Sequence, residues 1–360
     1  MPTKIAEENK KLNDSERNAQ LKILQSKPQR IVFETTNRCN LRCQMCGQSH
    51  RKFIGVDMSI ETFKKTEPFW PTVYDVSLFG WGEPLLNPHL GKFFDMIIVH
   101  EPRVFVLTNG MLLKNDLIEK FVKGGLAFLN FSFDGVTAET YNKIRRGSDF
   151  NKVLSNIKKV VEIKKREKKD APYLRMVFVG MRQNIEEFPK FVELASELGM
   201  DEAKMVYMIA YGDSMRGEVL FYYKELTNMM LDEAKKKAET LGIKLNIPDR
   251  FDLNKNKVRQ NNNSKHKFCC RPWEELFVQS DGKVRLCMLS KEIMGDLHKE
   301  SAIDIWNNER LQFFREWVNS KSPPSTCAHC PQYREMNVDD IDSFVQVATE
   351  LPGTEEAIKC

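Results

Sequence analysis

The chain alternates between short apolar runs and longer stretches whose apolar side chains have helical spacing. The apolar runs, rich in β-branched residues, are 30–36, 75–80, 103–108, 128–133, 173–179 and 203–208. The stretches with helical spacing between them are 59–69, 89–100, 114–123, 137–168 and 186–198. Strands that alternate with helices predict parallel strands joined by right-handed crossovers. The pattern therefore predicts an α/β fold, a partial (β/α)6 TIM-like barrel, with a doubly wound sheet as the alternative.

The segments outside this alternation differ in composition. Residues 5–27 are mostly polar and predict a helix that Pro28 ends, and 218–242 also show helical spacing. The polar run 249–267 contains three consecutive asparagines, which is typical of a linker. We expect an N-terminal helix, the barrel, a helix with a linker, a small cysteine-rich domain and a tail, at residues 1–28, 29–225, 226–265, 266–335 and 336–360.

Composition narrows the class of protein. The 360 residues are 41% hydrophobic and 29% charged, and the net charge is +5. No apolar run approaches the about 20 residues of a membrane span, and the polar N-terminus lacks a signal segment. Lys and Arg gather at 158–169, but with the spacing of a solvated helix face. We therefore expect a cytoplasmic protein without membrane or nucleic-acid partners, whose nine cysteines are reduced.

Three cysteines lie directly after the first apolar run, as Cys39-x3-Cys43-x2-Cys46. Three thiolates on one short loop can hold three irons of a [4Fe–4S] cluster, which leaves the fourth iron without a protein ligand. A zinc site that His50 completes is the alternative reading of this loop. An open iron is a place for chemistry, whereas a fully ligated cluster mainly stores an electron.

The following strand ends carry glycine and polar side chains. They read Gly80-Trp81-Gly82-Glu83-Pro84, Thr108-Asn109-Gly110 and Ser132-Phe133-Asp134-Gly135. Each is typical of a turn when taken alone. In parallel α/β folds, however, the carboxyl ends of the strands meet at one edge, where ligands bind. Glycine-rich backbone can present carbonyls to an ammonium group, and hydroxyl and carboxylate groups suit a ribose or an amino-acid end.

With these motifs, residues 29–210 resemble the radical S-adenosylmethionine (SAM) superfamily. The resemblance implies that Cys39, Cys43 and Cys46 hold a [4Fe–4S] cluster whose open iron binds SAM. It also implies SAM-binding residues, namely Gly82, Glu83, Asn109, Ser132, Asp134, Arg182 and Asn184. Many members have an aromatic residue before the third cysteine, where this chain has Met45. The implied chemistry is reductive cleavage of SAM to a 5′-deoxyadenosyl radical, fed by an electron donor such as flavodoxin or ferredoxin.

A second cysteine set comprises Cys269, Cys270, Cys287, Cys327 and Cys330. Asp281-Gly282 predicts a hairpin that returns Cys269 or Cys270 to Cys287, and a zinc ribbon is one reading of the set. This region resembles SPASM and twitch domains, which bind auxiliary [4Fe–4S] clusters. The resemblance favours one auxiliary cluster on Cys269, Cys287, Cys327 and Cys330, with Cys270 as a neighbour, a substitute ligand for Cys269 or a hydrogen donor.

These parts suggest hydrogen abstraction from a small polar metabolite such as a sugar, aminocyclitol or nucleoside. One auxiliary cluster suits an oxidation, and a nearby thiol would suit an epimerisation. A peptide substrate is the alternative, although only 38 residues precede Cys39, fewer than a leader-binding module needs. A non-catalytic electron carrier would have no need of Gly82 and Glu83. Residues expected near the rim of the site are Gln48, His50, Arg51, Tyr211 and Arg216.

Overall fold

The computed structural model describes the chain except for residues 1, 51–53, 254–267, 329, 331–343 and 345–360. Predictions about Arg51, the side chain of His50, Cys360, most of the polar linker and nearly all of the tail lie outside the described residues.

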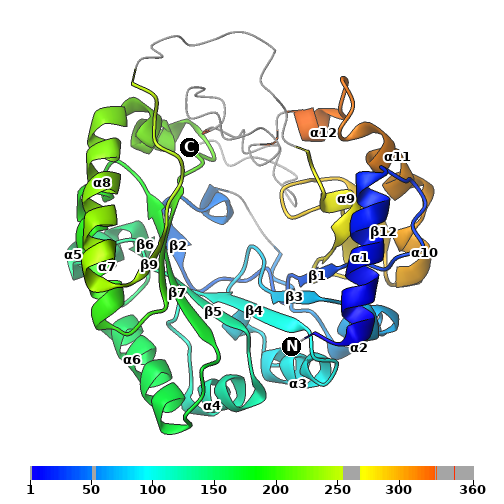
Figure 1. Cartoon of the computed structure of the whole chain (residues 1–360), viewed down its shortest axis with the longest axis horizontal. Coiled ribbons are helices and arrows are strands. Elements are labelled where there is room, and N and C mark those ends of the chain that lie inside the picture. The colour runs from blue at the N-terminus through cyan, green and yellow to red at the C-terminus, as the bar shows by residue number, and fades with distance from the viewer. Residues whose placement is uncertain (1, 51–53, 254–267, 329, 331–343, 345–360) are drawn as a thin grey trace.

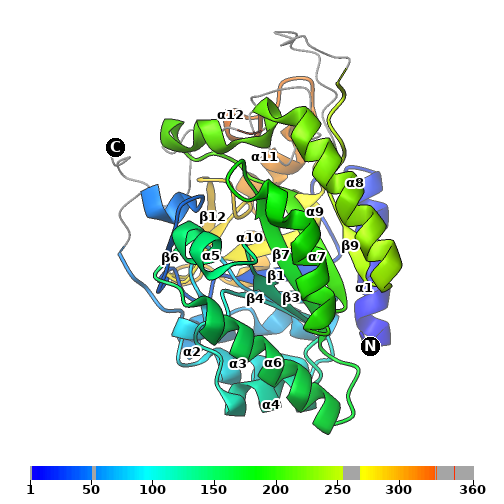
Figure 2. The same cartoon turned by 90° about the vertical axis from the view of Figure 1, so that its left-hand side faces the viewer.

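Six parallel strands form the centre of the fold (Figure 1). They are β1 (Arg30–Phe33), β3 (Asp75–Leu78), β4 (Arg103–Thr108), β5 (Phe128–Ser132), β7 (Tyr173–Gly180) and β8 (Glu202–Tyr207). They are neighbours in chain order, and the helices between them cover one face of the curved sheet (Figures 1 and 2). These helices are α2 (Ile60–Lys64), α3 (Leu90–Ile98), α4 (Asn115–Gly124), α5 (Ala138–Ile144), α6 (Phe150–Arg166) and α7 (Phe188–Glu197). This order confirms the partial barrel and excludes the doubly wound alternative, whose strand order reverses.

The two faces of the sheet differ in polarity. In β4, Val104 and Val106 are buried in the hydrophobic core with the helices, whereas Arg103 and Phe105 are only half-buried on the inner face. Side chains alternate between the two faces along each strand. Asp75 and Arg103 are paired on β3 and β4, so both lie on the inner face. An ion pair joins Arg103 to Asp75 there, at 2.7 Å.

The cysteine-rich C-terminal part continues the same sheet. Its strand β10 (Glu275–Val278) pairs in parallel with β1, and β11 (Lys283–Arg285) and β12 (Ile293–Asp296) follow antiparallel. Gly282, at φ 82°, makes the predicted hairpin turn between β10 and β11. The remaining helices there are α9 (Arg271–Glu274), α10 (Ala302–Trp306), α11 (Glu309–Trp317) and α12 (Ser325–Ala328). At the opposite edge, α8 (Lys224–Leu241) leads to β9 (Lys244–Asn246), which pairs with β8. The described sheet thus has ten strands.

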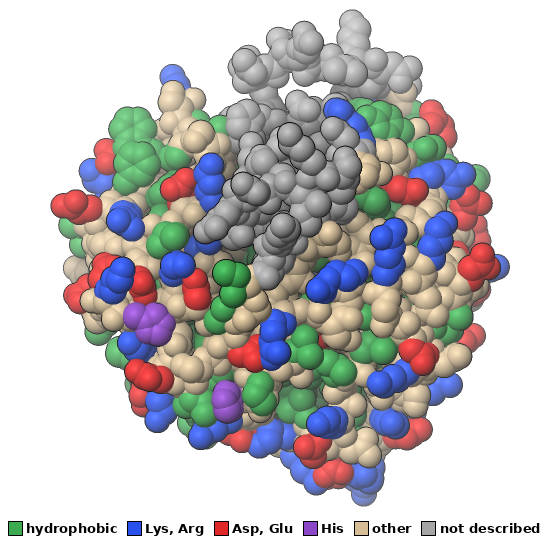
Figure 3. Space-filling model, turned by 180° about the vertical axis from the view of Figure 1, so that it is seen from behind, with side chains coloured by type: hydrophobic (Ala, Val, Ile, Leu, Met, Phe, Trp, Pro, Cys, Tyr) green, Lys and Arg blue, Asp and Glu red, His purple; other side chains and the backbone are tan. Residues whose placement is uncertain are grey.

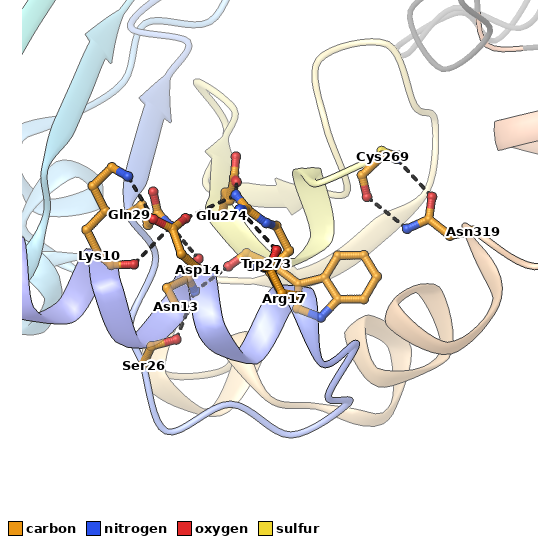
Figure 4. Close-up of polar contacts among 11 residues, drawn as sticks. Lys10, Asn13, Asp14, Arg17, Ser26, Gln29, Cys269, Trp273, Glu274 and Asn319 are labelled. Carbon is orange, nitrogen blue, oxygen red and sulfur yellow. Dashed lines mark hydrogen bonds and ion pairs between the residues drawn. The ribbon is translucent and has the colours of Figure 1, made fainter. Parts of the chain in front are cut away.

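Helix α1 (Lys4–Asn18) packs against the C-terminal part (Figures 1 and 4). Asn13 donates to the Trp273 carbonyl at 2.7 Å and to the Ser26 hydroxyl at 2.8 Å. Arg17 forms an ion pair with Glu274, and the Trp273 indole donates to the Leu21 carbonyl at 2.9 Å. The first helix therefore fixes α9, which directly follows Cys269 and Cys270.

The first and the longest of the predicted helices are wrong in extent. The helix expected over 5–27 ends at Asn18, because the Glu16 carboxylate accepts the backbone N–H groups of Gln25 and Ser26 and turns the chain back. The helix expected over 137–168 is broken by the short strand β6 (Arg145–Arg146) and by Gly147, at φ 88°.

The surface mixes charges of both signs. On the face shown in Figure 3, Lys and Arg side chains alternate with Asp and Glu over the described part. Within the described ranges, no helix combines the length and the hydropathy that a bilayer span requires.

Candidate cluster and cofactor site

The three-cysteine loop leaves the carboxyl end of β1. Its short strand β2 (Arg42–Cys43) pairs antiparallel with β6, which places Cys43 opposite Arg145. The Leu41 N–H lies 3.4 Å from the Cys39 sulfur, and the Ser49 hydroxyl donates to the Cys43 carbonyl at 2.8 Å. The Cys39 thiol lies close enough to Cys43 and Cys46 for their charges to interact. The Cys39 thiol is therefore the common neighbour of the other two thiols of the loop.

These thiols suit a soft metal group. Burial raises the pKa of Cys43 to about 11 and also raises the pKa of Cys39. Such thiols stay protonated at neutral pH until a metal displaces their protons. Among the residues that the structure describes, no three His, Cys, Asp or Glu side chains lie close enough together to ligate a single metal ion. The all-sulfur donor set fits an iron–sulfur cluster.

Arg145 is a buried cation beside this loop that the sequence analysis missed. Its guanidinium pairs with the buried Asp134 at 2.6 Å and lies 3.9 Å from the Cys43 sulfur. Asp134 also accepts the Val179 N–H at 2.7 Å. A positive charge here favours thiolate or a negatively charged cluster at Cys43. The pairing of two very short strands, β2 and β6, places Arg145 beside Cys43. No pattern in the sequence predicts that pairing.

The Gly80–Pro84 loop packs directly on the chain that enters the cysteine loop. A Cβ atom on Gly82 would lie 2.3 Å from the Thr36 carbonyl oxygen and 2.5 Å from that of Arg38. The Glu83 N–H donates to the Arg38 carbonyl at 2.8 Å. Only glycine permits this approach of two backbones.

Glu83 and Asn109 connect three strand-end loops. The buried Glu83 carboxylate accepts the Thr108 hydroxyl at 2.6 Å and the Asn109 N–H at 2.7 Å. Burial raises the pKa of Glu83 to about 7. The Asn109 amide donates to Asn40, in the cysteine loop, at 3.0 Å. The sequence motifs at these loops therefore meet at one edge of the sheet.

The other predicted SAM-binding residues have different surroundings. Ser132 ends β5 and is half-buried on the inner face. The Asn184 amide donates to the Asp134 and Val179 carbonyls, both at 3.0 Å, and is buried. Arg182 is half-buried, and its guanidinium pairs at the surface with Glu186 at 2.7 Å. The structure thus brings Asn184 to Asp134 but directs Arg182 to a surface ion pair.

The rim residues expected from sequence also differ in their contacts. Gln48 is buried and donates to the Asn37 carbonyl, inside the cysteine loop. Tyr211 lies edge-on to Trp81, with ring centroids 5.8 Å apart. Arg216 is exposed. Tyr211 therefore lies beside the glycine-rich loop, and Gln48 serves the loop's own structure.

The second thiol set gathers four cysteines. The Cys269, Cys287, Cys327 and Cys330 thiols interact electrostatically with one another. Burial raises the pKa of Cys269 and of Cys287 to about 12, and it also raises the pKa of Cys327. Asn319 fixes the backbone of Cys269 by accepting from its N–H at 2.8 Å and donating to its carbonyl at 3.1 Å (Figure 4). Four thiols gathered in one place fit a fully ligated cluster.

Cys270 has different surroundings. Burial and the neighbouring Glu274 carboxylate, which hydrogen-bonds its thiol, raise the pKa of Cys270 to about 11. Its charge also interacts with that of Arg17, on helix α1. The Cys270 thiol therefore lies on the side of α9 that faces the N-terminal helix.

Trp81 connects the two thiol sites. Its backbone N–H donates to the buried Glu34 carboxylate, and its indole N–H donates to the carbonyl of Met288, next to Cys287, both at 3.2 Å. The loop that carries Gly82 and Glu83 is therefore in contact with the second thiol site.

Comparisons with known proteins agree with this geometry. Residues 33–195 match the profile of the radical SAM superfamily, and residues 269–331 match that of the SPASM iron–sulfur cluster-binding domain. The tungsten-containing aldehyde ferredoxin oxidoreductase cofactor-modifying protein of Pyrococcus furiosus is 24% identical, covering 83% of this chain and 86% of its own. The probable GTP 3′,8-cyclase of Methanocaldococcus jannaschii is 26% identical, covering 81% and 95%.

A solved structure shows the same fold. SuiB of Streptococcus suis, bound to S-adenosylmethionine, superposes with a TM-score of 0.64 at 15% identity, covering 94% of this chain and 81% of SuiB. The first profile match includes the three cysteines of the cysteine loop, and the second includes the cysteines of the second thiol set. The chain belongs to the radical SAM superfamily and carries a C-terminal SPASM iron–sulfur cluster-binding domain.

Proposed function

We propose that this radical SAM enzyme is an oxidoreductase that removes a hydrogen atom from a small polar substrate and passes a second electron to one auxiliary cluster. The observation that carries this proposal is the placement of both thiol sites on one continuous sheet. Strand β10 pairs with β1, so the auxiliary thiols lie beside the strand that enters the cysteine loop. Trp81 spans the two sites.

In this proposal Cys39, Cys43 and Cys46 hold the SAM-binding [4Fe–4S] cluster. Bound there, the cluster and SAM supply a 5′-deoxyadenosyl radical when a donor such as flavodoxin or ferredoxin provides an electron. The Glu83 carboxylate is already satisfied by internal donors, so we assign the methionine ammonium to backbone carbonyls of the Gly82–Glu83 loop. Asn109 and Ser132 remain to contact the ribose or the carboxylate of SAM.

Asp134, Asn184 and Arg182 receive supporting roles. Asp134 neutralises Arg145 beside Cys43, and Asn184 holds the backbone of Asp134 in place. Arg182 is assigned no contact with SAM, because its guanidinium pairs with Glu186 at the surface.

The auxiliary cluster is assigned to Cys269, Cys287, Cys327 and Cys330. Four thiolates leave no iron open, which suits storage of an electron rather than binding of substrate. The Cys270 thiol is engaged by Glu274 on the side of helix α1. That placement favours oxidation over an epimerisation in which Cys270 would return a hydrogen atom.

The polar inner face of the sheet supports a small polar substrate. Arg30, Arg175 and Glu202 all lie on this face. Arg30 pairs with Glu275, and the half-buried Arg175 pairs with the buried Glu202. A relative that covers most of this chain, the probable GTP 3′,8-cyclase, is named for a small polar molecule. Another relative is named a PqqA peptide cyclase, at 21% identity, so a peptide substrate is an outcome that the experiment must be able to reveal.

The test begins with anaerobic protein reconstituted with iron and sulfide, then incubated with SAM and dithionite. We expect methionine and 5′-deoxyadenosine from the parent and none from the Cys39→Ala/Cys43→Ala/Cys46→Ala variant. The matched variant, with Cys269, Cys287, Cys327 and Cys330 changed to Ala, should lose iron but still cleave SAM. Equal iron content and equal cleavage in the parent and the triple variant would overturn the assignment.

The substrate class is tested with deuterium. Extracts of cells grown in heavy medium are separated into small polar molecules and peptides, and each fraction is added to the SAM cleavage assay. Hydrogen abstraction from substrate carbon transfers deuterium to 5′-deoxyadenosine, which mass spectrometry detects. We expect the label from the small-molecule fraction, and label from the peptide fraction alone would replace the proposal with peptide modification.

A further inference from the structure

Two rows of side chains cross the inner face between β5 and β9. The first row is Ser132, Val177, Lys204 and Asn246, and the second is Asn130, Arg175, Glu202 and Lys244. Residues between the rows, such as Met176 and Ala203, are buried beneath the helices, so both rows face the opposite, concave side. Arg175 pairs with Glu202, and Lys204 is two residues further along β8, so Lys204 and Arg175 are diagonal neighbours on adjacent strands about 4.8 Å apart.

The charges of this region do not balance locally. The Glu202 carboxylate already pairs with Arg175 at 2.8 Å, accepts the Tyr173 hydroxyl at 3.0 Å and lies 3.7 Å from Lys244. The Lys204 ammonium is half-buried, and within the described part of the chain it has neither an ion pair nor a hydrogen bond. Burial and, after it, the nearby Arg175 charge lower the pKa of Lys204, although the Glu202 carboxylate opposes this shift.

A half-buried ammonium without a partner is costly to keep charged. A ligand anion placed beside it would remove that cost, and the attraction is stronger there than in bulk water because the effective dielectric is lower. Lysine offers a mobile point charge, whereas the guanidinium of Arg175 is a planar fork. Carboxylate and phosphate groups bind to both.

We propose that Lys204, supported by Arg175, binds a carboxylate or phosphate group of the substrate on the concave face of β7 and β8. The inference rests on the proposed function, because it assigns this face to the substrate, and it narrows the substrate class to anionic small molecules. Ser132, in the same row as Lys204, then lies on the path from this anion to the SAM-binding edge.

The test uses the full-length, cluster-loaded protein under anaerobic conditions at constant ionic strength. Thermal unfolding is followed with added inorganic phosphate, with added malonate, and with sodium chloride alone. A ligand that binds the folded state raises the midpoint by mass action. We expect the parent midpoint to rise with at least one of the two anions, Lys204→Gln to lose that rise and Lys204→Arg to keep it. The matched control is Lys235→Gln, on the exposed face of α8, which should respond as the parent does.

The pattern of response identifies the group. A rise with phosphate alone indicates a phosphate ester, a rise with malonate alone indicates a carboxylate, and a rise with both indicates a general anion site. No rise in the parent, or an equal rise in Lys204→Gln, would overturn the inference. These results are independent of the proposed function, whose own failure would appear as absence of 5′-deoxyadenosine from the parent.

A second measurement does not depend on the folding of any variant. Acetylation of lysines in the parent protein is followed by mass spectrometry, with and without the anion that raises the midpoint. The anion should slow the modification of Lys204 several-fold and leave that of Lys235 unchanged. Equal rates at Lys204 with and without the anion would contradict the proposal.

Discussion

At the scale of single residues, Arg145 and Asp134 form a buried ion pair directly beside the cysteine loop. The side chains are 7% and 0% exposed, and the pair lies 2.6 Å apart. A buried ion pair is weak evidence of stabilisation in itself. Removing one partner, however, leaves the other charge buried without a counter-ion or water. Arg145 also faces the Cys43 sulfur, so it connects the stability of the loop with the charge of the site.

Arg145→Met should therefore destabilise the protein by about 3–5 kcal/mol, because Asp134 is left buried and unpaired. Urea unfolding measures the loss, and iron content after reconstitution shows whether the cysteine loop still closes. The control is Arg146→Met, the exposed neighbour on the same strand, which should change the free energy of unfolding little. Equal effects of the two substitutions would argue against a special role for the pair.

Gly82→Ala should disturb the SAM-binding edge. The added Cβ would lie 2.3 Å from the Thr36 carbonyl oxygen, and backbone atoms on both sides must move apart. We expect a loss of about 1–3 kcal/mol in the free energy of unfolding and a marked loss of SAM cleavage. Gly217→Ala is the control, since an added Cβ there meets nothing within 4 Å. Parent-like SAM cleavage by Gly82→Ala would contradict the close packing of the two backbones.

Glu34 should make the stability depend on pH. Burial raises its pKa from the ordinary 4.5 to about 7, so the folded protein binds this proton more tightly than the unfolded chain does. The free energy of unfolding therefore falls as the pH rises from about 4.5 to about 7, by up to ~3 kcal/mol from this group. Glu34→Gln should flatten that fall in urea unfolding at pH 5 and pH 8, whereas Glu239→Gln, exposed on α8, should not. A parent-like slope in Glu34→Gln would show that Glu34 does not titrate in this range.

The site motifs were predictable where their signal is local. Cys39, Cys43 and Cys46 are close in sequence. Gly82 and Asn109 follow strands whose apolar patterns are clear in the sequence. The contacts of Arg145 with Cys43 and of Trp81 with Met288 were not predictable, because these partners are more than 100 residues away in the chain. Glu83 was assigned to SAM from its motif, and only the structure shows its carboxylate satisfied by Thr108 and Asn109.

At the scale of elements, the six barrel strands were predictable because their short apolar runs alternate along the chain with segments of helical spacing. The break between α5 and α6 had a local signal that the periodicity concealed. Gly147 takes a positive φ, and Asp149 caps α6 by accepting the Lys152 N–H. The pairing of β10 with β1 had no local signal in the sequence. The paired residues Arg30 and Glu275 are 245 positions apart in the chain.

Helix α1 should control how well the auxiliary site assembles. Asn13→Ala removes the donor to the Trp273 carbonyl, and a buried acceptor left unpaired costs about 1–3 kcal/mol. We expect lower stability and less iron in the auxiliary site, measured on the Cys39→Ala/Cys43→Ala/Cys46→Ala background, where only that cluster can form. Lys11→Ala, on the exposed side of the same helix, is the control. Full iron occupancy in Asn13→Ala would separate α1 from the auxiliary site.

At the scale of the whole molecule, the barrel and the SPASM part share one sheet and one hydrophobic core. Strand β1 is central in the sheet, with β3 on one side and β10 on the other. The core cluster contains Ile31 and Leu78 from the barrel together with Leu276 and Trp306 from the C-terminal part. The domain boundaries expected from the sequence suggest two independent units. In the structure, the pairing of β10 with β1 and the common hydrophobic core connect the two cysteine sites mechanically.

This coupling predicts a single cooperative unfolding unit. Leu276→Ala, in β10, leaves a cavity in the shared core and should cost about 2–5 kcal/mol. Because β10 pairs with β1, amide hydrogen exchange should accelerate in β1 and β3 as well as in β10. Ile303→Ala, whose side chain is 46% exposed on α10, is the control and should leave all three strands protected. Faster exchange confined to β10–β12 would instead show that the SPASM part opens alone, and the two cluster sites would then be independent in stability.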